Sequence, residues 1–359
     1  MLKKPVSIII PVCDLLYYTR QCIESIFSAT PEKLFELIVV DNGSAPSMQE
    51  YLKNQPDRVT CVTNKTNLGF ARACNQGAEA ARGEYLVFLN NDTIARPGWL
   101  EELLKTATSG PDAGLTGSKL LFPNNTVQHC GIVFGPRKYP YQIYRGCPAD
   151  LPCVNKPREF QAVTAACMLV PAKYFQEVKG FDETYVNGCE DVDFCLKIRS
   201  LGRRCLYSPQ SVVTHYEGRS PNRQARMQGN YDYLLKKWSS VICHDDVTFF
   251  AQDKVMLHRT ELGTGYKNLL TGEQYPEPEG LFIQAKNWLT TGNAQQAINY
   301  FDGLLAYDPY NENALKTLGE FSFKTRNFAA ANGFYSKLIE LHPQDQQLKR
   351  VVSDIQSLM

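Results

Sequence analysis

Short β-branched runs alternate with amphipathic stretches over residues 6–90. The runs have the length and composition of buried strands, and they lie at 6–12, 35–41, 58–63 and 84–90. Between them, the stretches 15–27 and 69–81 space their apolar residues as amphipathic helices do. Alternation of this kind requires crossovers between parallel strands, so the sequence predicts an α/β fold with a doubly wound sheet.

Each predicted strand is followed by a polar, turn-prone loop. The loops read "PVCD" at 11–14, "VDNGS" at 40–44, "TNKTNLG" at 63–69 and "NND" at 90–92. Any one of them suits ordinary turn chemistry. Because ligands of such sheets bind at the carboxyl ends of the strands, four polar loops on one edge favour a ligand site. The chain has neither a dinucleotide fingerprint after the first strand nor a P-loop.

Residues 115–181 show a less regular pattern and are rich in Pro, Tyr and Cys. A helix is expected to begin near Pro171 and to end at Gly180. After it, "NGCEDVDFC" indicates a turn and an acid-rich helix start. Two strand-like runs, 205–208 and 211–215, precede a further predicted helix at 222–241.

The C-terminal part contains an internal repeat. Residues 293–309 align with residues 327–343 at a spacing of 34 residues. Matched positions include Asn293 with Asn327, Ala297 with Ala331, Phe301 with Tyr335, Leu304 with Leu338 and Pro309 with Pro343. The period and pattern resemble the tetratricopeptide repeat, a helix-turn-helix unit. We expect three parts: a first domain at 1–245, a linker rich in Gly, Glu and Pro at 246–279, and an all-α repeat domain at 280–359.

Two such units and a last helix are fewer than a free-standing array normally needs. We therefore expect the repeats to dock on the first domain or on a second chain, and to bind a protein partner or acceptor. The alternative is an appendage that only stabilises the fold.

Composition and charge exclude several classes. The 359 residues are 43% hydrophobic and 21% charged, and Lys plus Arg number 38 against 37 for Asp plus Glu, which does not indicate a nucleic-acid partner. The apolar run 6–12 is too short for a signal peptide or a membrane helix. Twelve cysteines without a C-x-x-C pair favour reduced thiols. We expect a soluble cytoplasmic protein, with peripheral contact at the inner face of the membrane left open.

Two acidic positions carry candidate chemistry. Asp92 ends a strand at the ligand edge, where one carboxylate can share a hard divalent cation with a substrate's phosphates. Glu190, Asp191 and Asp193 cluster at a helix start, where a carboxylate could act as a general base. Acids in a first helical turn are also favoured by the helix dipole, so this cluster alone leaves a structural explanation open.

Five segments in order resemble the inverting family 2 glycosyltransferases. They are "VSIIIPVCD…CIESI", "ELIVVDNGS", "TNLGFARACNQGAEAARGEYLVFLNND", "GFDETYVNGCEDVDFCLKIRSLG" and "HYEGRS". The likeness covers about residues 5–240, and it extends to bacterial members that build surface glycans, including a rhamnosyltransferase-like group. It implies a GT-A fold, with a doubly wound mixed sheet that binds a nucleotide sugar.

The resemblance assigns donor and metal residues. Those implied to bind the donor are Pro11, Val12, Asp14, Asp41, Asn67, Gly69, Arg72, Asn91 and Asp92. Asn90 stands where the family usually has the first Asp of its D-x-D triplet, so Asp92 alone would carry the triplet's metal contact. His215 would complete the shell of the cofactor, Mn²⁺ or Mg²⁺. A soft site of Cys189, Cys195 and His215 is discounted, because C-x5-C is not a usual zinc spacing.

The resemblance also places the general base on Asp191. Glu190 would orient the base or contact the acceptor, and Asp193 is the substitute candidate for the base. Arg219 is expected near the leaving group, and His129 on the acceptor side.

The leading hypothesis is a metal-dependent inverting glycosyltransferase that moves a sugar from a nucleoside diphosphate to a hydroxyl acceptor on a surface glycan or a protein. One alternative is an inactive scaffold that binds partners through its repeats. Another is a sugar nucleotidyltransferase, although the glycine-free loop after the first strand disfavours it. The sugar and the nucleotide stay open, as does the oligomeric state, for which a homodimer through the repeats is one option.

Overall fold

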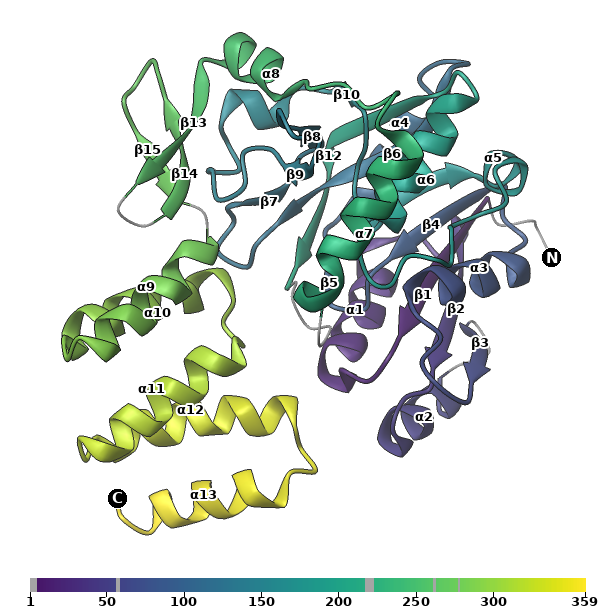
Figure 1. Ribbon diagram of the computed structural model, residues 1–359. Coiled ribbons are helices and arrows are strands. Elements are labelled where there is room, and N and C mark those ends of the chain that lie inside the picture. Colours follow the sequence, from purple (N-terminus) through teal and green to yellow (C-terminus); the bar gives the residue numbers. More distant parts are fainter. Residues whose placement is uncertain (1–4, 56–58, 217–222, 261–262, 277) are drawn as a thin grey trace. The chain divides into compact units, whose positions relative to one another are not determined.

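The computed structural model describes residues 5–55, 59–216, 223–260, 263–276 and 278–359. The chain divides into two compact units. The first comprises Met1–Leu121 and Val127–Lys254, and the second comprises Phe122–Thr126 and Val255–Met359. Each unit is described by itself below (Figure 1).

A mixed sheet forms the centre of the first unit, in the order β10-β12-β6-β11-β4-β1-β2-β3 (Figure 1). Strands β4, β1, β2 and β3 are parallel, whereas β11 runs antiparallel between β4 and β6. Short strands β5 and β7 add to β12 and β6. The strands are β1 (Val6–Val12), β2 (Phe35–Asn42), β3 (Val59–Asn64), β4 (Tyr85–Leu89), β5 (Thr93–Ala95), β6 (Ala113–Leu121), β7 (Val127–His129), β10 (Arg158–Phe160), β11 (Cys167–Pro171) and β12 (Arg204–His215). A hairpin of β8 (Ile132–Phe134) and β9 (Pro140–Gln142) lies apart. The predicted mixed α/β sheet is confirmed.

Helices cover both faces of this sheet. One apolar cluster joins the sheet to α1 (Leu16–Ala29), α2 (Pro46–Lys53) and α4 (Trp99–Ala107). The other joins it to α3 (Phe70–Ala80), α5 (Ala172–Glu177), α6 (Glu190–Ser200) and α7 (Arg223–Trp238). Side chains alternate between faces along a strand, so Ile8 and Ile10 of β1 enter the first cluster and Ile9 the second. A strand buried on both faces favours a nearly continuous apolar run, as at 6–12, where the one polar residue, Ser7, donates to Glu36 Oε1 at 2.6 Å.

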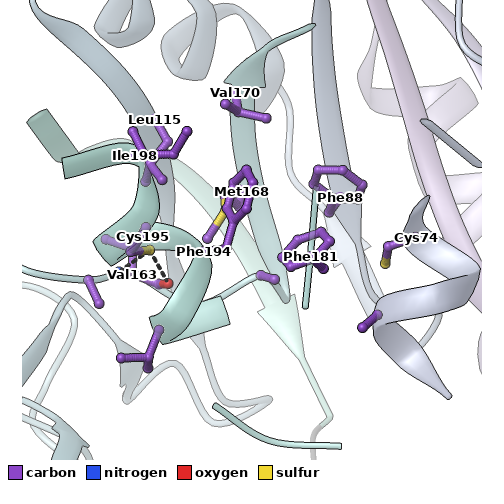
Figure 2. Packing of buried hydrophobic residues seen from close by; sticks show 14 of the residues in the cluster. Cys74, Phe88, Leu115, Val163, Met168, Val170, Phe181, Phe194, Cys195 and Ile198 are labelled. Atoms are coloured by element: carbon purple, nitrogen blue, oxygen red, sulfur yellow. Dashed lines mark hydrogen bonds between the residues drawn. The ribbon is translucent and has the colours of Figure 1, made fainter. Parts of the chain in front are cut away.

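The second cluster contains phenylalanines packed edge-to-face or tilted against one another (Figure 2). The ring of Phe181 lies 4.8 Å from that of Phe88 on β4 and 4.6 Å from that of Phe194 on α6. Aromatic pairs at these distances favour tilted geometry and add to the burial energy. The contacts fix α6, which carries the acidic cluster, against the strand that ends in the Asn-Asn-Asp triplet.

Two strands differ from the sequence prediction. β6 crosses the segment that looked irregular, and all of its residues are buried. Two of its polar side chains find distant partners: Ser118 Oγ lies 2.7 Å from Ser211 Oγ, and Lys119 Nζ donates to Asn155 Oδ1 at 2.7 Å. β12 is one strand where two were expected, because a bulge between Ser208 and Val212 accommodates the proline there.

All twelve cysteines are free thiols, and most are buried in the first unit. Burial raises the pKa of Cys22 and of Cys167 to about 12 in each case. These thiols therefore stay neutral and pack as small apolar groups. Among the helices that the structure describes, none combines the length and the apolar character that crossing a bilayer requires.

The stretch 246–279, expected as a linker, contains regular structure. It forms α8 (Asp246–Asp253) and an antiparallel sheet of β13 (Val255–Thr260), β14 (Gly263–Asn268) and β15 (Gln274–Pro276). Glycine is needed at the turn between β14 and β15, where Gly272 has φ 79°. Asn268 Oδ1 stabilises the same turn by accepting from the Leu270 N–H at 2.9 Å.

The rest of the second unit is a series of helical hairpins. They are formed by α9 (Pro278–Thr290), α10 (Ala294–Tyr307), α11 (Glu312–Lys324), α12 (Phe328–Leu341) and α13 (Gln346–Gln356). Asn293 and Asn327 repeat the same N-cap, accepting from Gln296 N and Ala330 N. Gly319 of α11 allows close approach, since a Cβ there would lie 2.9 Å from the Tyr335 ring of α12. The predicted helix-turn-helix repeat is confirmed.

Candidate active site

The Asn-Asn-Asp triplet forms a tight turn between β4 and β5. The Asn90 N–H donates to the Ala166 carbonyl at 3.0 Å, which extends the pairing of β4 with β11 by one residue. The Asn90 carbonyl accepts from Thr93 Oγ1 at 2.7 Å, closing the turn, and from the buried Cys22 thiol at 3.5 Å. β5 then pairs with the end of β12, so that Thr93 lies opposite His215. The turn therefore brings Asp92 beside a residue 123 positions away in the sequence.

Asp92 and His215 form a buried pair at this turn. Asp92 Oδ1 lies 3.1 Å from His215 Nε2, and the two side chains are each 6% exposed. The Asp92 carbonyl accepts from the Tyr216 N–H at 2.9 Å, which fixes the backbone of both strands. Asn90 Nδ2 approaches the same His215 nitrogen at 3.3 Å. A residue that sequence reasoning missed, Gln128 of β7, lies 2.6 Å from the other ring nitrogen.

The pair fits the ligand set of a divalent cation. Two ligands at right angles, each about 2.1 Å from an octahedral ion, lie about 3.0 Å apart, close to the observed 3.1 Å. A carboxylate with an imidazole suits a transition metal such as Mn²⁺ better than Mg²⁺. Within the described ranges, His, Cys, Asp and Glu side chains form no group of three that could hold a metal. Asp92 and His215 would therefore need oxygen ligands from a substrate to complete a shell.

Amide side chains connect the loops that follow β1, β2 and β3. Asn42 Nδ2 donates to Asn67 Oδ1 at 3.0 Å, and Asn42 Oδ1 accepts from Asn64 Nδ2 at 3.1 Å. Asn67 in turn donates to Cys13 Sγ at 3.2 Å and accepts from the Gly69 N–H at 2.9 Å. Gly69 has φ 88°, a conformation that favours glycine. The expected donor residues Asn67 and Gly69 thus lie beside the loop after β1.

The acids of the first two loops bind backbone groups. Asp14 Oδ1 accepts from the Ala45 N–H at 2.7 Å, where α2 begins, and Asp41 Oδ1 accepts from the Ser44 N–H at 3.0 Å. Asp14 is exposed, and Asp41 is buried at the end of β2. Both carboxylates fix the conformation of these loops through their hydrogen bonds. Pro11 and Val12 are the last two residues of β1, and Val12 is buried.

Asn91 and Arg72 lie at the rim of this edge. Asn91 Nδ2 donates to Thr19 Oγ1 at 2.9 Å and points toward the Asp14 carbonyl at 3.5 Å. Arg72, half-exposed on α3, pairs with Glu183 at 3.9 Å. The structure therefore brings the loops after β1 to β4 together, and Arg72 faces the loop that leads into α6.

Asp191 is linked to the triplet through two adjacent residues. Its Oδ2 accepts from the Ala165 N–H at 3.3 Å, and the next residue, Ala166, binds Asn90. Asp191 is partly exposed in the first turn of α6, and its Oδ1 accepts from the Val192 N–H at 2.8 Å. This carboxylate is thus linked to the Asn90 turn through Ala165 and Ala166, and it remains partly exposed to solvent.

Glu190 points away from solvent. Its carboxylate is buried and accepts from the Gly188 N–H at 2.6 Å. Asn187 and Cys189 have φ of 52° and 69°, and Gly188 has φ 149°, so Glu190 binds across a turn of sparsely populated backbone conformations. In this geometry Glu190 orients the turn before Asp191.

Asp193 is fully buried and binds α7. Its Oδ1 accepts from Trp238 Nε1 at 2.7 Å and from Lys237 Nζ at 2.6 Å, while Lys197 lies 3.5 Å from Oδ2. Burial and then the charge of Asp193 raise the pKa of Tyr185, which donates to the same carboxylate at 3.3 Å. These contacts occupy Asp193 within the core, so it is an unsuitable substitute for the general base.

We expect Asp193→Asn to lower the free energy of unfolding by about 2 kcal/mol, because it removes the buried carboxylate that pairs with Lys197 and Lys237, although Lys237 keeps its second partner, Asp182. Urea denaturation measures this loss. A second change, Lys237→Met, should recover part of it, since the two effects are coupled. Loss of turnover at unchanged stability would contradict the structural role of Asp193.

Two other candidates lie elsewhere. His129 is buried, with its Nδ1 3.2 Å from Gln142 Oε1, so it does not line an open acceptor surface. The reason is register: His129 and Gln128 alternate on β7, and it is Gln128 that faces His215. Arg219 lies outside the described residues.

Comparisons with known proteins bear on this site. Residues 7–128 match the family described as glycosyl transferase family 2, and residues 289–355 match the tetratricopeptide repeat. The O-antigen biosynthesis protein RfbC of Myxococcus xanthus is 32% identical over 234 residues, covering 63% of this chain and 18% of that protein. The N-acetylglucosaminyl-diphospho-decaprenol L-rhamnosyltransferase of Mycobacterium tuberculosis is 24% identical over 268 residues, covering 64% of this chain and 85% of that protein. The chain spans only 18–28% of the length of curated relatives that match it at 32% identity.

The fold also has a solved counterpart. The crystal structure of GalNAc-T7 with UDP, GalNAc and Mn²⁺ matches with a TM-score of 0.54 at 18% identity, covering 70% of this chain and 50% of that one. At this identity the likeness concerns the fold alone, and it confirms the expected GT-A type of mixed sheet.

Proposed function

We propose that this chain is a metal-dependent inverting glycosyltransferase. The proposal builds on its family 2 glycosyltransferase domain and its C-terminal tetratricopeptide repeats, both of which its motifs predicted. The donor is a nucleoside diphosphate sugar, and the acceptor is a hydroxyl group on a glycan or a protein. The observation that carries this proposal is the buried Asp92–His215 pair at the ligand edge, with the partly exposed Asp191 linked to the same turn through Ala165 and Ala166.

Donor binding is assigned to the loops at the ends of β1 to β4. Asp92 Oδ1 and His215 Nε2 would hold Mn²⁺ or Mg²⁺, which when bound neutralises charge on the departing diphosphate. Asn67, Gly69 and Asn91 border the same edge and would orient the nucleotide through amide and backbone groups.

Asp191 would act as the general base. Its carboxylate takes the proton of the acceptor hydroxyl while that oxygen forms a bond to the anomeric carbon. The bond from this carbon to the diphosphate oxygen breaks on the opposite side, and the diphosphate leaves with the bonding electrons. Attack opposite the leaving group inverts the anomeric configuration. Glu190, bonded to Gly188, would keep the turn before Asp191 in place.

The acceptor class follows from the relatives and the repeats. One relative is named for O-antigen biosynthesis and another as a rhamnosyltransferase acting on a lipid-linked sugar, which supports a surface-glycan acceptor here. The tetratricopeptide repeats support recognition of a protein, either as partner or as acceptor. We propose a surface glycan as the acceptor and a protein as the partner that the repeats bind.

The stereochemical course tests this proposal. The protein is incubated with UDP-, GDP- and dTDP-sugars and Mn²⁺, and proton NMR follows the anomer of the sugar that is transferred, to water if no acceptor is added. We expect one donor to react and its sugar to appear first as the inverted anomer. A retained anomer would exclude direct displacement assisted by Asp191.

A further inference from the structure

We propose that Gln128 is a positioning residue that fixes the hydrogen of His215 on Nδ1 and so presents the lone pair of Nε2 to the cation beside Asp92. The proposal rests on the proposed function, because it assumes that Asp92 and His215 hold a metal. Sequence reasoning did not single out Gln128, and it lies on β7, far from both residues in the sequence.

The orientation of the Gln128 amide follows from its second contact. Gln128 Nε2 donates to the His215 carbonyl oxygen at 3.2 Å. A carbonyl oxygen can only accept, so the nitrogen of the amide must face it. The amide oxygen, Oε1, is then the atom that lies 2.6 Å from His215 Nδ1. Because Oε1 is also only an acceptor, Nδ1 must carry a hydrogen and donate it.

The consequence falls on the other ring nitrogen. A neutral imidazole has one N–H, and with it on Nδ1, the Nε2 atom keeps its lone pair. Nε2 lies 3.1 Å from Asp92 Oδ1 and accepts from Asn90 Nδ2 at 3.3 Å. Two lone-pair atoms thus converge on the position assigned to the cation. An outer hydrogen bond that sets the tautomer and raises ligand basicity is a general feature of histidine metal ligands.

Gln128 cannot itself contact the donor sugar or the acceptor. It is 1% exposed, and His215 stands between it and Asp92. Its bonds to the ring and to the carbonyl hold His215 at two points and restrict rotation of the imidazole about its side-chain bonds. Among the described residues, these bonds give Gln128 a direct path to the cation position through His215.

Two substitutions separate positioning from packing. In Gln128→Glu, a carboxylate oxygen still accepts from Nδ1–H. Gln128→Met keeps the shape but cannot accept this bond. We expect Gln128→Met to weaken Mn²⁺ binding by about 10–100-fold and Gln128→Glu to stay closer to wild type. A packing role predicts the reverse order, since Met is the apolar match and Glu adds a buried charge.

Mn²⁺ alone is the probe, and electron paramagnetic resonance of the free ion measures its affinity. The matched control is Gln142→Met, which removes the amide beside another buried histidine, His129, and should bind Mn²⁺ as wild type does. Thermal unfolding shows whether each variant is folded. If Gln128→Met does not fold, the affinity of Gln128→Glu still tests the proposal. Equal affinity in Gln128→Met and wild type, or weaker binding in Gln128→Glu than in Gln128→Met, would overturn the proposal. Because a substrate's oxygen atoms are needed to complete the shell, the wild type is also titrated in the presence of UDP, GDP and dTDP. Failure of the wild type to bind Mn²⁺ with any of them would instead overturn the metal role of Asp92 and His215, so the two failures are distinguishable.

The tautomer has its own spectroscopic readout. Long-range proton–nitrogen NMR shows which ring nitrogen of a histidine is protonated, and the five histidines of the chain are few enough for His215→Gln to assign the signal. We expect the proton on Nδ1 of His215. A proton on Nε2 alone would overturn the inference.

Discussion

Asp191→Asn should abolish sugar transfer while leaving donor binding intact. The amide keeps the size of the carboxylate and can still accept the bond from Ala165 N–H, so the start of α6 should not change. It cannot take a proton from the acceptor, and loss of a general base lowers turnover by about 10²–10⁴-fold. Release of nucleoside diphosphate in the presence of acceptor measures the turnover, and calorimetry measures the dissociation constant of the donor.

The matched control is Asp150→Asn, which removes the charge of an exposed aspartate of the same unit and should leave both quantities unchanged. Turnover of Asp191→Asn at the wild-type rate would exclude Asp191 as the base. A parallel loss of donor affinity would place Asp191 in the donor site, contrary to the role derived from its geometry.

Asp92→Ala should lower turnover by about 10²–10³-fold, since the charge stabilisation that a bound cation supplies is worth several kcal/mol. Asp92 Oδ1 and His215 Nε2 lie 3.1 Å apart, so if they hold one cation as proposed, substitution of either would remove a ligand of the same ion. The rate at saturating donor, measured over a range of Mn²⁺ concentrations, should show a higher requirement for the metal in the variant.

The double variant Asp92→Ala, His215→Ala distinguishes a shared ion from two separate roles. If both side chains hold one cation, the double variant should lose little more than either single variant, because the interaction is already lost. Losses that multiply would show that the two residues act independently and would contradict the shared site. Thermal unfolding of each variant separates these effects from loss of fold.

The strands rich in β-branched residues could be predicted from sequence, and the buried strand β6 could not. β1 and β2 are buried on both faces, so their composition alone identified them. β6 is equally buried, but its Thr116, Ser118 and Lys119 resemble a loop. Ser118 and Lys119 find their partners, Ser211 and Asn155, in distant segments, and no local pattern shows that these bonds form. The repeats were predictable because their caps recur at a fixed period, as at Asn293 and Asn327.

Some residues of the candidate site could likewise be predicted from sequence, and others could not. Strand ends and family resemblance together indicated Asp92, Asp191 and His215. The spacing "EDVD" could not tell which acid is buried: Asp191 and Asp193 lie about 200° apart around a helix, and only packing decides that Asp193 turns inward toward Lys237. Gln128 was missed because its partner is 87 positions away and its neighbour His129 is the more reactive residue type.

The most direct test of the account is the release of nucleoside diphosphate from a single nucleotide sugar with Mn²⁺, after chelation, and after Mn²⁺ is added back. The account predicts turnover of one donor that stops on chelation, resumes with the metal, and is nearly absent in Asp92→Ala under all three conditions. Turnover that persists in chelator, or that is unchanged in Asp92→Ala, would contradict a metal-dependent transferase centred on Asp92 and His215.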